Sequence, residues 1–241
     1  YYALDVTDPS SPSLLWEYTN ADDADLGYTY GNPVVTKKSD GTWVVVFASG
    51  YNNSSSGSGR GYLYVLNANS GAQLSKIDTN VGDATTPSGL AKISAWVDNL
   101  DRNNTAGYVY GTDLLGNVWR FDINAASAFK FAVLRDALSA VQPITTAPEL
   151  GLVNGQRVVF VGTGKYLETA DLTTTQRQSI YAIKDDGATS TLDTPRTGTG
   201  ANAFVVQTLT VSSTDAAVRV ASTNPVDWSN QRGWYIDLPA A

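Results

Sequence analysis

The stretch Asn117-Val118-Trp119-Arg120-Phe121-Asp122 closes an apolar run with an acidic residue, and this arrangement recurs along the chain. Five copies end at Asp5, Asn67, Asp122, Lys184 and Asp237, as Tyr-Ala-Leu-Asp, Tyr-Val-Leu-Asn, Trp-Arg-Phe-Asp, Tyr-Ala-Ile-Lys and Trp-Tyr-Ile-Asp. The copies are 62, 55, 62 and 53 residues apart, and self-similarity at such a period is typical of propeller blades or solenoid arrays. The chain is therefore expected to be a repeat protein.

The composition narrows the class of protein. The 241 residues are 42% hydrophobic and only 16% charged, which suits short strands joined by many turns. A net charge of -7 argues against nucleic-acid binding, which needs clustered basic residues, and would suit cation binding. The chain contains no histidine and no cysteine, which excludes Ser-His-Asp, Cys-His and thiolate-metal chemistry. No apolar run is long enough to span a membrane.

Each repeat reads as an apolar strand, a glycine-containing loop and a second strand that carries the recurring pattern. Residues 43–50 and 62–66 form one such pair, followed by an edge strand at residues 73–77. The sequence thus predicts an all-β fold, a β-propeller of four-stranded antiparallel blades in a single domain over residues 1–241, with about four complete units. Loop insertions are expected near residues 51–61 and 187–203, the first with flexible linker composition. Both ends fall within a repeat, which predicts a trimmed or partial propeller.

Three stretches of the sequence are distinctive. They are residues 113–123 (Asp-Leu-Leu-Gly-Asn-Val-Trp-Arg-Phe-Asp-Ile), residues 1–9 with Leu15-Trp16-Glu17-Tyr18, and Gly162-Thr163-Gly164-Lys165-Tyr166-Leu167-Glu168 with Gln178-Ser179-Ile180-Tyr181. All three resemble the PilY/PilC family of type IV pilus tip proteins. Residues 233–238 give a weaker further match. The resemblance covers nearly the whole chain.

The resemblance implies a C-terminal, quinoprotein-like β-propeller in a secreted or cell-surface protein at the Gram-negative pilus or outer membrane. The expected function is non-enzymatic: pilus biogenesis, control of assembly and retraction, twitching motility and adhesion. The expected partners are pilus subunits or minor pilins and a host-surface receptor or glycan, with no nucleic acid and no membrane span. Two alternatives remain, a quinoprotein-type dehydrogenase and a carbohydrate-binding propeller.

The family also carries a calcium loop of EF-hand character, which the resemblance places at residues 98–107. Counting back from Tyr110, the alternate positions are Asn99, Asp101, Asn103, Thr105 and Gly107, and Asp98 joins them if the register shifts by one residue. Calcium prefers six to eight hard oxygen ligands, and only Asp101 among these alternate positions is a carboxylate. Calcium is therefore the expected cofactor, with a plain Asx-type turn as the competing interpretation.

Other polar features are interpreted as structural. The acidic cluster Asp22-Asp23-Ala24-Asp25 is expected to be a solvated turn, and Asp113 and Asp122 are expected to accept backbone or cross-blade hydrogen bonds. Arg120 is expected to lie between blades or in the central channel, paired with a carboxylate. The stretch Gly162-Thr163-Gly164-Lys165 lacks the spacing of a phosphate-binding loop, so nucleotide binding is rejected.

Overall fold

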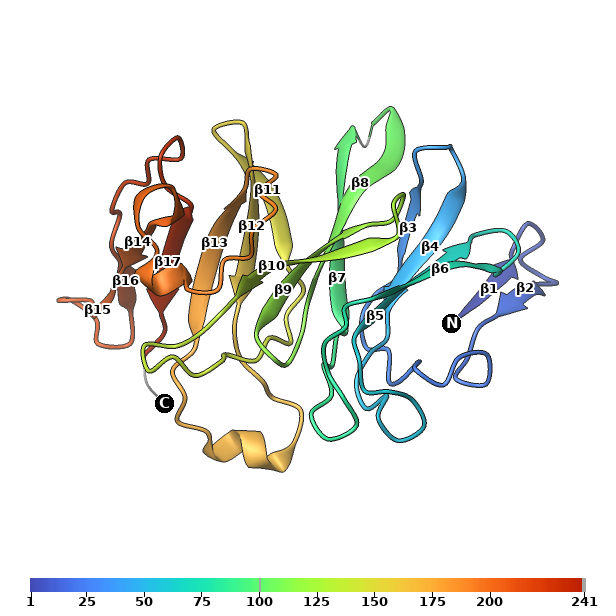
Figure 1. The fold of residues 1–241 in the computed structure, drawn as a ribbon, viewed down its shortest axis with the longest axis horizontal. Coiled ribbons are helices and arrows are strands. Elements are labelled where there is room, and N and C mark those ends of the chain that lie inside the picture. The colour runs from blue at the N-terminus through green and yellow to red at the C-terminus, as the bar shows by residue number, and fades with distance from the viewer. Residues whose placement is uncertain (100, 240–241) are drawn as a thin grey trace. The chain divides into compact units, whose positions relative to one another are not determined.

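The computed structural model describes residues 1–99 and 101–239 (Figure 1). Within this range the chain forms β-strands and three short 3-10 helices. The strands are β1 (Tyr2–Asp5), β2 (Ser13–Glu17), β3 (Val34–Lys37), β4 (Trp43–Ala48), β5 (Tyr62–Asn67), β6 (Gln73–Asp78), β7 (Lys92–Asn99), β8 (Asn103–Thr112), β9 (Asn117–Asp122), β10 (Ser127–Val133), β11 (Glu149–Val153), β12 (Gln156–Gly162), β13 (Ser179–Asp185), β14 (Phe204–Gln207), β15 (Leu209–Val211), β16 (Arg219–Ala221) and β17 (Gly233–Asp237). The helices are η1 (Thr169–Thr173), η2 (Pro195–Thr197) and η3 (Gly200–Asn202).

The chain divides into two compact units. The first unit comprises residues 1–113 and 119–129, and the second comprises residues 114–118 and 130–241.

The main sheet of the first unit has the predicted antiparallel plan. Strands β3, β4, β5 and β6 follow one another in space as in sequence, each antiparallel to the next. Residues 44–48 of β4 are buried, because both faces of this strand are covered. That explains why its sequence is a continuous β-branched and aromatic run instead of an alternating one. Strands β7 and β8 pair antiparallel, and the sheet continues from β8 through β9 to β10. One parallel pairing of Lys37 with Thr105 joins β3 to β8.

The second unit contains a sheet of order β11-β12-β13-β17-β14. Strand β17 carries the fifth copy of the recurring pattern, and it pairs antiparallel with β13, which carries the fourth copy. Two copies therefore share one sheet. Strand β14 adds to β17 in parallel, from Phe204 beside Gly233 to Gln207 beside Ile236.

The two faces of β5 contribute to two hydrophobic clusters of the first unit. Tyr64 and Leu66 pack with Trp16, Tyr18 and Phe47, together with the partly buried Ala3 of β1. Leu63 and Val65 pack in a second cluster with residues of β4, β8 and β9. A strand carrying the recurring pattern thus has both faces covered, as expected of a sheet stacked between neighbours.

Strand β1 departs from this arrangement. Its Tyr2 and Leu4 occupy the repeat positions of Tyr64 and Leu66, counted from Asp5 and Asn67. Tyr2 and Leu4 are 67% and 44% exposed, whereas Tyr64 and Leu66 are fully buried. The β1–β2 sheet has only two strands, and its outward face is apolar and open to solvent in the described part of the chain.

Candidate functional site

The guanidinium of Arg196 lies at the centre of a hydrogen-bond network in the second unit. Its Nη1 donates to Asp237 Oδ2 at 3.1 Å, and its Nη2 donates to Asp237 Oδ1 and, at 2.7 Å, to Ser179 Oγ. Its Nε donates to the carbonyl oxygen of Arg135 at 2.5 Å and to the Tyr181 hydroxyl at 3.0 Å. Every nitrogen of the guanidinium is therefore used, and Arg196 fastens η2 to β13 and β17.

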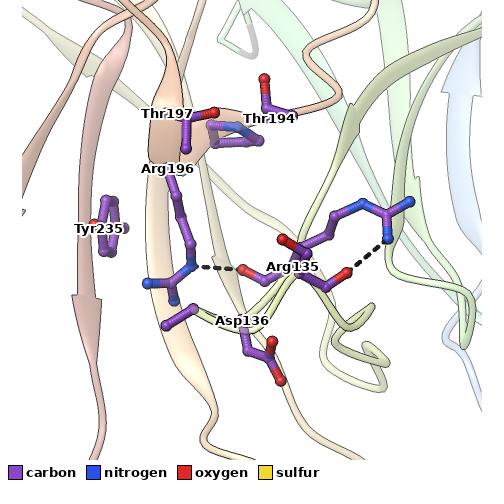
Figure 2. A pocket seen from close by; sticks show the side chains of 9 residues that line it. Arg135, Asp136, Thr194, Arg196, Thr197 and Tyr235 are labelled. Atoms are coloured by element: carbon purple, nitrogen blue, oxygen red, sulfur yellow. Dashed lines mark hydrogen bonds between the residues drawn. The ribbon is translucent and has the colours of Figure 1, made fainter.

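A cavity of about 260 Å³ opens beside this network. Its wall comes from three separate stretches: the loop after β10, the η2 segment and β17. In Figure 2 the Arg196 side chain extends between Tyr235 on one side and the backbone of Arg135 on the other. The Cζ atom of Arg196 lies 4.4 Å from the centroid of the Tyr235 ring, which is buried, so the cation packs against an aromatic face. Thr194 and Thr197 line the same cavity.

The electrostatics of the network favour its charged forms. Burial raises the pKa of Asp237, but the hydrogen bonds from Arg196 and Ser179 outweigh this and hold its pKa below the usual value. Burial likewise lowers the pKa of Arg196, and Asp237 and Tyr181 more than compensate, so that the pKa of the guanidinium is raised. Burial raises the pKa of the Tyr181 phenol to about 12. The pair stays ionised and the phenol stays protonated at neutral pH.

The cavity offers binding contacts rather than a set of reactive groups. The Asp136 carboxylate at its edge already accepts the backbone N–H groups of Leu138 and Ala140 and the side-chain amide of Gln176. Arg135 donates Nη1 to the carbonyl oxygen of Ser139. The remaining lining consists of hydroxyl groups, the Tyr235 ring and the apolar residues Ala137 and Pro195. The arrangement holds the η2 segment in place and leaves room for a small polar group.

The residues predicted to bind calcium lie on the hairpin between β7 and β8. Asn99 pairs with Asn103 in the antiparallel ladder, and the Thr105 hydroxyl donates to Asn103 Oδ1 at 2.7 Å. Asp101 lies in the connecting turn, and Asp98 Oδ1 accepts the indole N–H of Trp96 at 2.5 Å. The ladder thus brings Asn99, Asn103 and Thr105 together.

These oxygens are hard donors of the kind calcium prefers, but they carry little charge. Within residues 1–99 and 101–239, no group of three acidic, histidine or cysteine side chains gathers at one point. The hairpin thus offers hard oxygen donors with little charge, and calcium binding there stays a prediction.

The acidic loop is bound by a lysine and is not simply solvated, so that prediction is wrong for Asp23 and Asp25. Lys76 Nζ lies 2.8 Å from Asp23 Oδ1 and 2.7 Å from Asp25 Oδ2, and it sits over the rings of Tyr62 and Tyr64. The ammonium comes from β6, about fifty residues away in sequence, so no local pattern could have indicated it.

The other predicted structural roles agree with the structure where it tests them. Asp113 is buried and accepts the indole N–H of Trp119 at 2.9 Å and the hydroxyl of Ser88 at 3.2 Å. Asp122 accepts the backbone N–H groups of residues 124 and 125, as a turn requires. Arg120 is buried, and its Cζ lies 5.1 and 4.9 Å from the ring centroids of Tyr108 and Phe129. Its expected pairing with a carboxylate stays a prediction.

The two long loops are both attached to the body of their unit. The loop at residues 51–61 is tied to residues 24–25 through Asn53, Ser56 and Ser58. The segment at residues 187–203 contains η2 and η3, and its Leu192 forms a parallel bridge with Ala132. Sequence reasoning missed Arg196 within this segment. The sequence feature that could have indicated Arg196 was its partner Asp237, the acidic residue that ends the fifth copy of the repeat.

A model of the PilY1 beta-propeller domain matches residues 1–224. The chain belongs to this family. The predicted all-β propeller fold and the resemblance to the PilY/PilC family are thereby confirmed.

Individual relatives extend the comparison. The chain is 34% identical to the type IV pilus biogenesis factor PilY1 of Pseudomonas aeruginosa over 98% of its own length and 23% of that protein. It is 28% identical to a PilY1 homolog of Xylella fastidiosa over 98% of this chain and 17% of that one. The crystal structure of the Pseudomonas aeruginosa PilY1 C-terminal domain superposes with a TM-score of 0.82 at 30% identity, covering 99% of this chain and 56% of that chain. The chain therefore spans less than a quarter of the curated relatives.

Proposed function

We propose that this chain is the propeller domain of a type IV pilus biogenesis factor that acts at the cell surface without catalysing a reaction. The observation that carries the proposal is the PilY1 domain match over residues 1–224, supported by 34% identity to a named pilus biogenesis factor across 98% of the chain. The proposed roles are pilus assembly and the control of its retraction, with twitching motility and surface attachment as the results. Pilus subunits or minor pilins are the proposed partners.

None of the helices in residues 1–99 and 101–239 is long and apolar enough to cross a bilayer. The cavity of about 260 Å³ in the second unit is lined by Arg196, which Asp237 holds in place, and by loop residues, an arrangement suited to binding.

The proposal is tested in the source bacterium by deleting the codons for residues 1–241 from the chromosomal gene. The expected result is a loss of surface pili by electron microscopy and a loss of twitching zones on agar. A matched strain carries Arg219→Ala, at an exposed position of β16, and should keep both. Normal pili and normal twitching in the deletion strain would contradict the proposal.

We also propose that the β7–β8 hairpin binds calcium weakly, through Asp98, Asn99, Asp101, Asn103 and Thr105. Its low charge points to dissociation constants of about 0.1–1 mM, as in extracellular calcium modules. A calorimetric titration of chelator-treated protein, with magnesium as the control ion, should show saturable binding of calcium. Melting curves of the same protein should show a higher melting temperature in calcium than in chelator. The Asp101→Ala variant should lose both effects, and unchanged binding in that variant would remove the assignment.

A further inference from the structure

A second cavity lies in the first unit, between the loop at residues 19–28 and the loop at residues 51–60. Its volume is about 350 Å³, near the lower end of the range of small-molecule sites, roughly 300–1,000 Å³. Leu26 and Tyr18 contribute a buried apolar floor. The exposed residues that line it include Asn20, Tyr28, Asn52 and Ser55.

The two loops meet through backbone contacts that only glycine allows. Tyr28 and Tyr51 form an antiparallel bridge, with N–H···O distances of 2.7 and 3.0 Å. A Cβ atom on Gly27 would lie 2.1 Å from the Tyr51 carbonyl oxygen, and one on Gly50 would lie 2.3 Å from the Tyr28 carbonyl oxygen. The two glycines therefore permit the close approach that presents Tyr28 at the cavity.

A second set of bonds holds the loops on the other side of the cavity. Asp25 Oδ1 accepts the backbone N–H of Ser58 at 2.5 Å and its hydroxyl at 2.7 Å, while its Oδ2 pairs with Lys76. The Asn53 side-chain amide donates to the carbonyl oxygens of Asp25 and Arg60. The loops are thus joined at both ends, and the cavity is formed before any ligand arrives. Such pre-organisation reduces the entropy lost on binding.

The chemistry of the lining selects a class of ligand. The Tyr28 side chain is 60% exposed, and its ring centroid lies 6.4 Å from that of Tyr30, which is 68% exposed. The side chains of Asn20, Asn52 and Ser55 make no hydrogen bond to another residue in the described part of the chain, so their donors and acceptors are available. No side chain that lines the cavity is charged. A matching ligand is uncharged, has an apolar face for an aromatic ring, and carries several hydroxyl groups.

We propose that this cavity binds a neutral saccharide, with the Tyr28 ring stacked on a sugar face and Asn20, Asn52 and Ser55 bonded to its hydroxyls. The loop that carries Asn20 also carries Asp22, Asp23 and Asp25, and the single positive charge of Lys76 is shared by Asp23 and Asp25. The loop therefore keeps a net negative charge, which disfavours an anionic sugar. The inference deepens the surface-attachment role under "Proposed function", because it gives that role a ligand class and a location.

The test measures the binding of the intact protein to mannose, galactose, N-acetylglucosamine and lactose, by saturation-transfer NMR and by calorimetry. Sialic acid is the charged probe. At least one neutral sugar should bind saturably, and sialic acid should not. Tyr28→Ala and Asn20→Ala should each weaken that binding by about tenfold, since each removes one of few contacts. Tyr166→Ala is the matched control, because Tyr166 is 76% exposed and belongs to the second unit, and it should bind as the unsubstituted protein does.

The proposal is overturned if none of the neutral sugars binds, if sialic acid alone binds, or if Tyr28→Ala leaves the affinity unchanged. Melting curves of each variant separate loss of a contact from loss of folding. Pili on cells that carry Tyr28→Ala are counted in parallel. Normal pili without saccharide binding in the unsubstituted protein would reject the saccharide site and leave the biogenesis role standing, whereas pili that persist after deletion of residues 1–241 reject that role independently.

Discussion

Arg196 and Asp237, 41 residues apart in sequence, form a bidentate ion pair. Nη1 of the arginine donates to Oδ2 of the carboxylate and Nη2 donates to Oδ1. The pair joins a short 3-10 turn to β17, the strand that carries the last copy of the repeat. Their side chains are 11% and 26% exposed, so solvent screens the pair only in part.

Removal of this arginine should destabilise the protein. Arg196→Ala leaves Asp237 without its charged partner and also exposes the Tyr235 ring, which the guanidinium covers. We expect a loss of about 2–4 kcal/mol in the free energy of unfolding, somewhat below the range for fully buried pairs. Arg196→Lys should recover only part of it, because an ammonium cannot donate to both oxygens in a planar fork. Urea melts measure the loss, with Arg219→Ala as the unaffected control.

The same pair predicts how stability depends on pH. The pKa of Asp237 is lowered in the folded protein, so its contribution is fully present above the ordinary carboxyl value of 3.8 and is lost as the pH falls through the folded value. We expect Asp237→Asn to be less stable than the unsubstituted protein at pH 7 and to show a smaller further loss below about pH 4. Melting temperatures between pH 2.5 and 7 test this. Parallel curves for the two proteins would contradict it.

Lys76 should be the residue on which the acidic loop depends. Lys76→Met keeps most of the side-chain volume but leaves Asp23 and Asp25 unpaired beside each other, whereas the triple variant with Asp23→Asn and Asp25→Asn removes the repulsion. We expect the single substitution to cost about 1–3 kcal/mol and the triple variant to regain part of it. A larger loss in the triple variant, measured by urea unfolding, would assign the effect to lost hydrogen bonds instead.

Two glycine positions give opposite expectations. Gly27→Ala would place a methyl group 2.1 Å from the Tyr51 carbonyl oxygen and should lower stability by about 2 kcal/mol or more. Gly107→Ala meets no atom nearer than Trp96 O at 4.0 Å and should change stability by less than about 0.5 kcal/mol. Thermal melts of the two variants in one buffer make the comparison. Equal effects would show that the Tyr28–Tyr51 contact readily relaxes.

The proposed calcium site on the β7–β8 hairpin can also be tested by adding a carboxylate. Gly107 is the last of the alternate positions counted from Tyr110, and a side chain there has room. Gly107→Asp should therefore raise calcium affinity by about tenfold or more, because each added carboxylate increases the charge of the donor set. A calorimetric titration beside Gly107→Asn, which adds oxygen without charge, measures this. Equal affinity in the two variants would place the cation elsewhere.

The strands were predictable because they depend on local patterns. Residues 43–48 and 62–67 are apolar runs bounded by turn residues, and they form β4 and β5 close to the expected limits. The role of Asp122 was equally local, since a carboxylate that follows a strand bonds to the next backbone N–H groups.

The pairing of β17 with β13 could not be predicted in the same way. Each copy of the repeat carries the same pattern, and periodicity does not say which copies share a sheet. The Arg196–Asp237 and Lys76–Asp25 pairs escaped prediction for a related reason. A single charged side chain in a loop has no periodic signal, and its partner is fixed only by the tertiary fold.

The β1–β2 sheet has a consequence for handling this 241-residue chain as a separate protein. In this short sheet Tyr2 and Leu4 are exposed and one strand edge is open. The sheet therefore offers another molecule both an apolar surface and unpaired backbone N–H and C=O groups. We expect the protein to self-associate reversibly at high concentration, despite its net charge of -7, and light scattering measures this association. Tyr2→Lys should improve solubility and leave the melting temperature nearly unchanged.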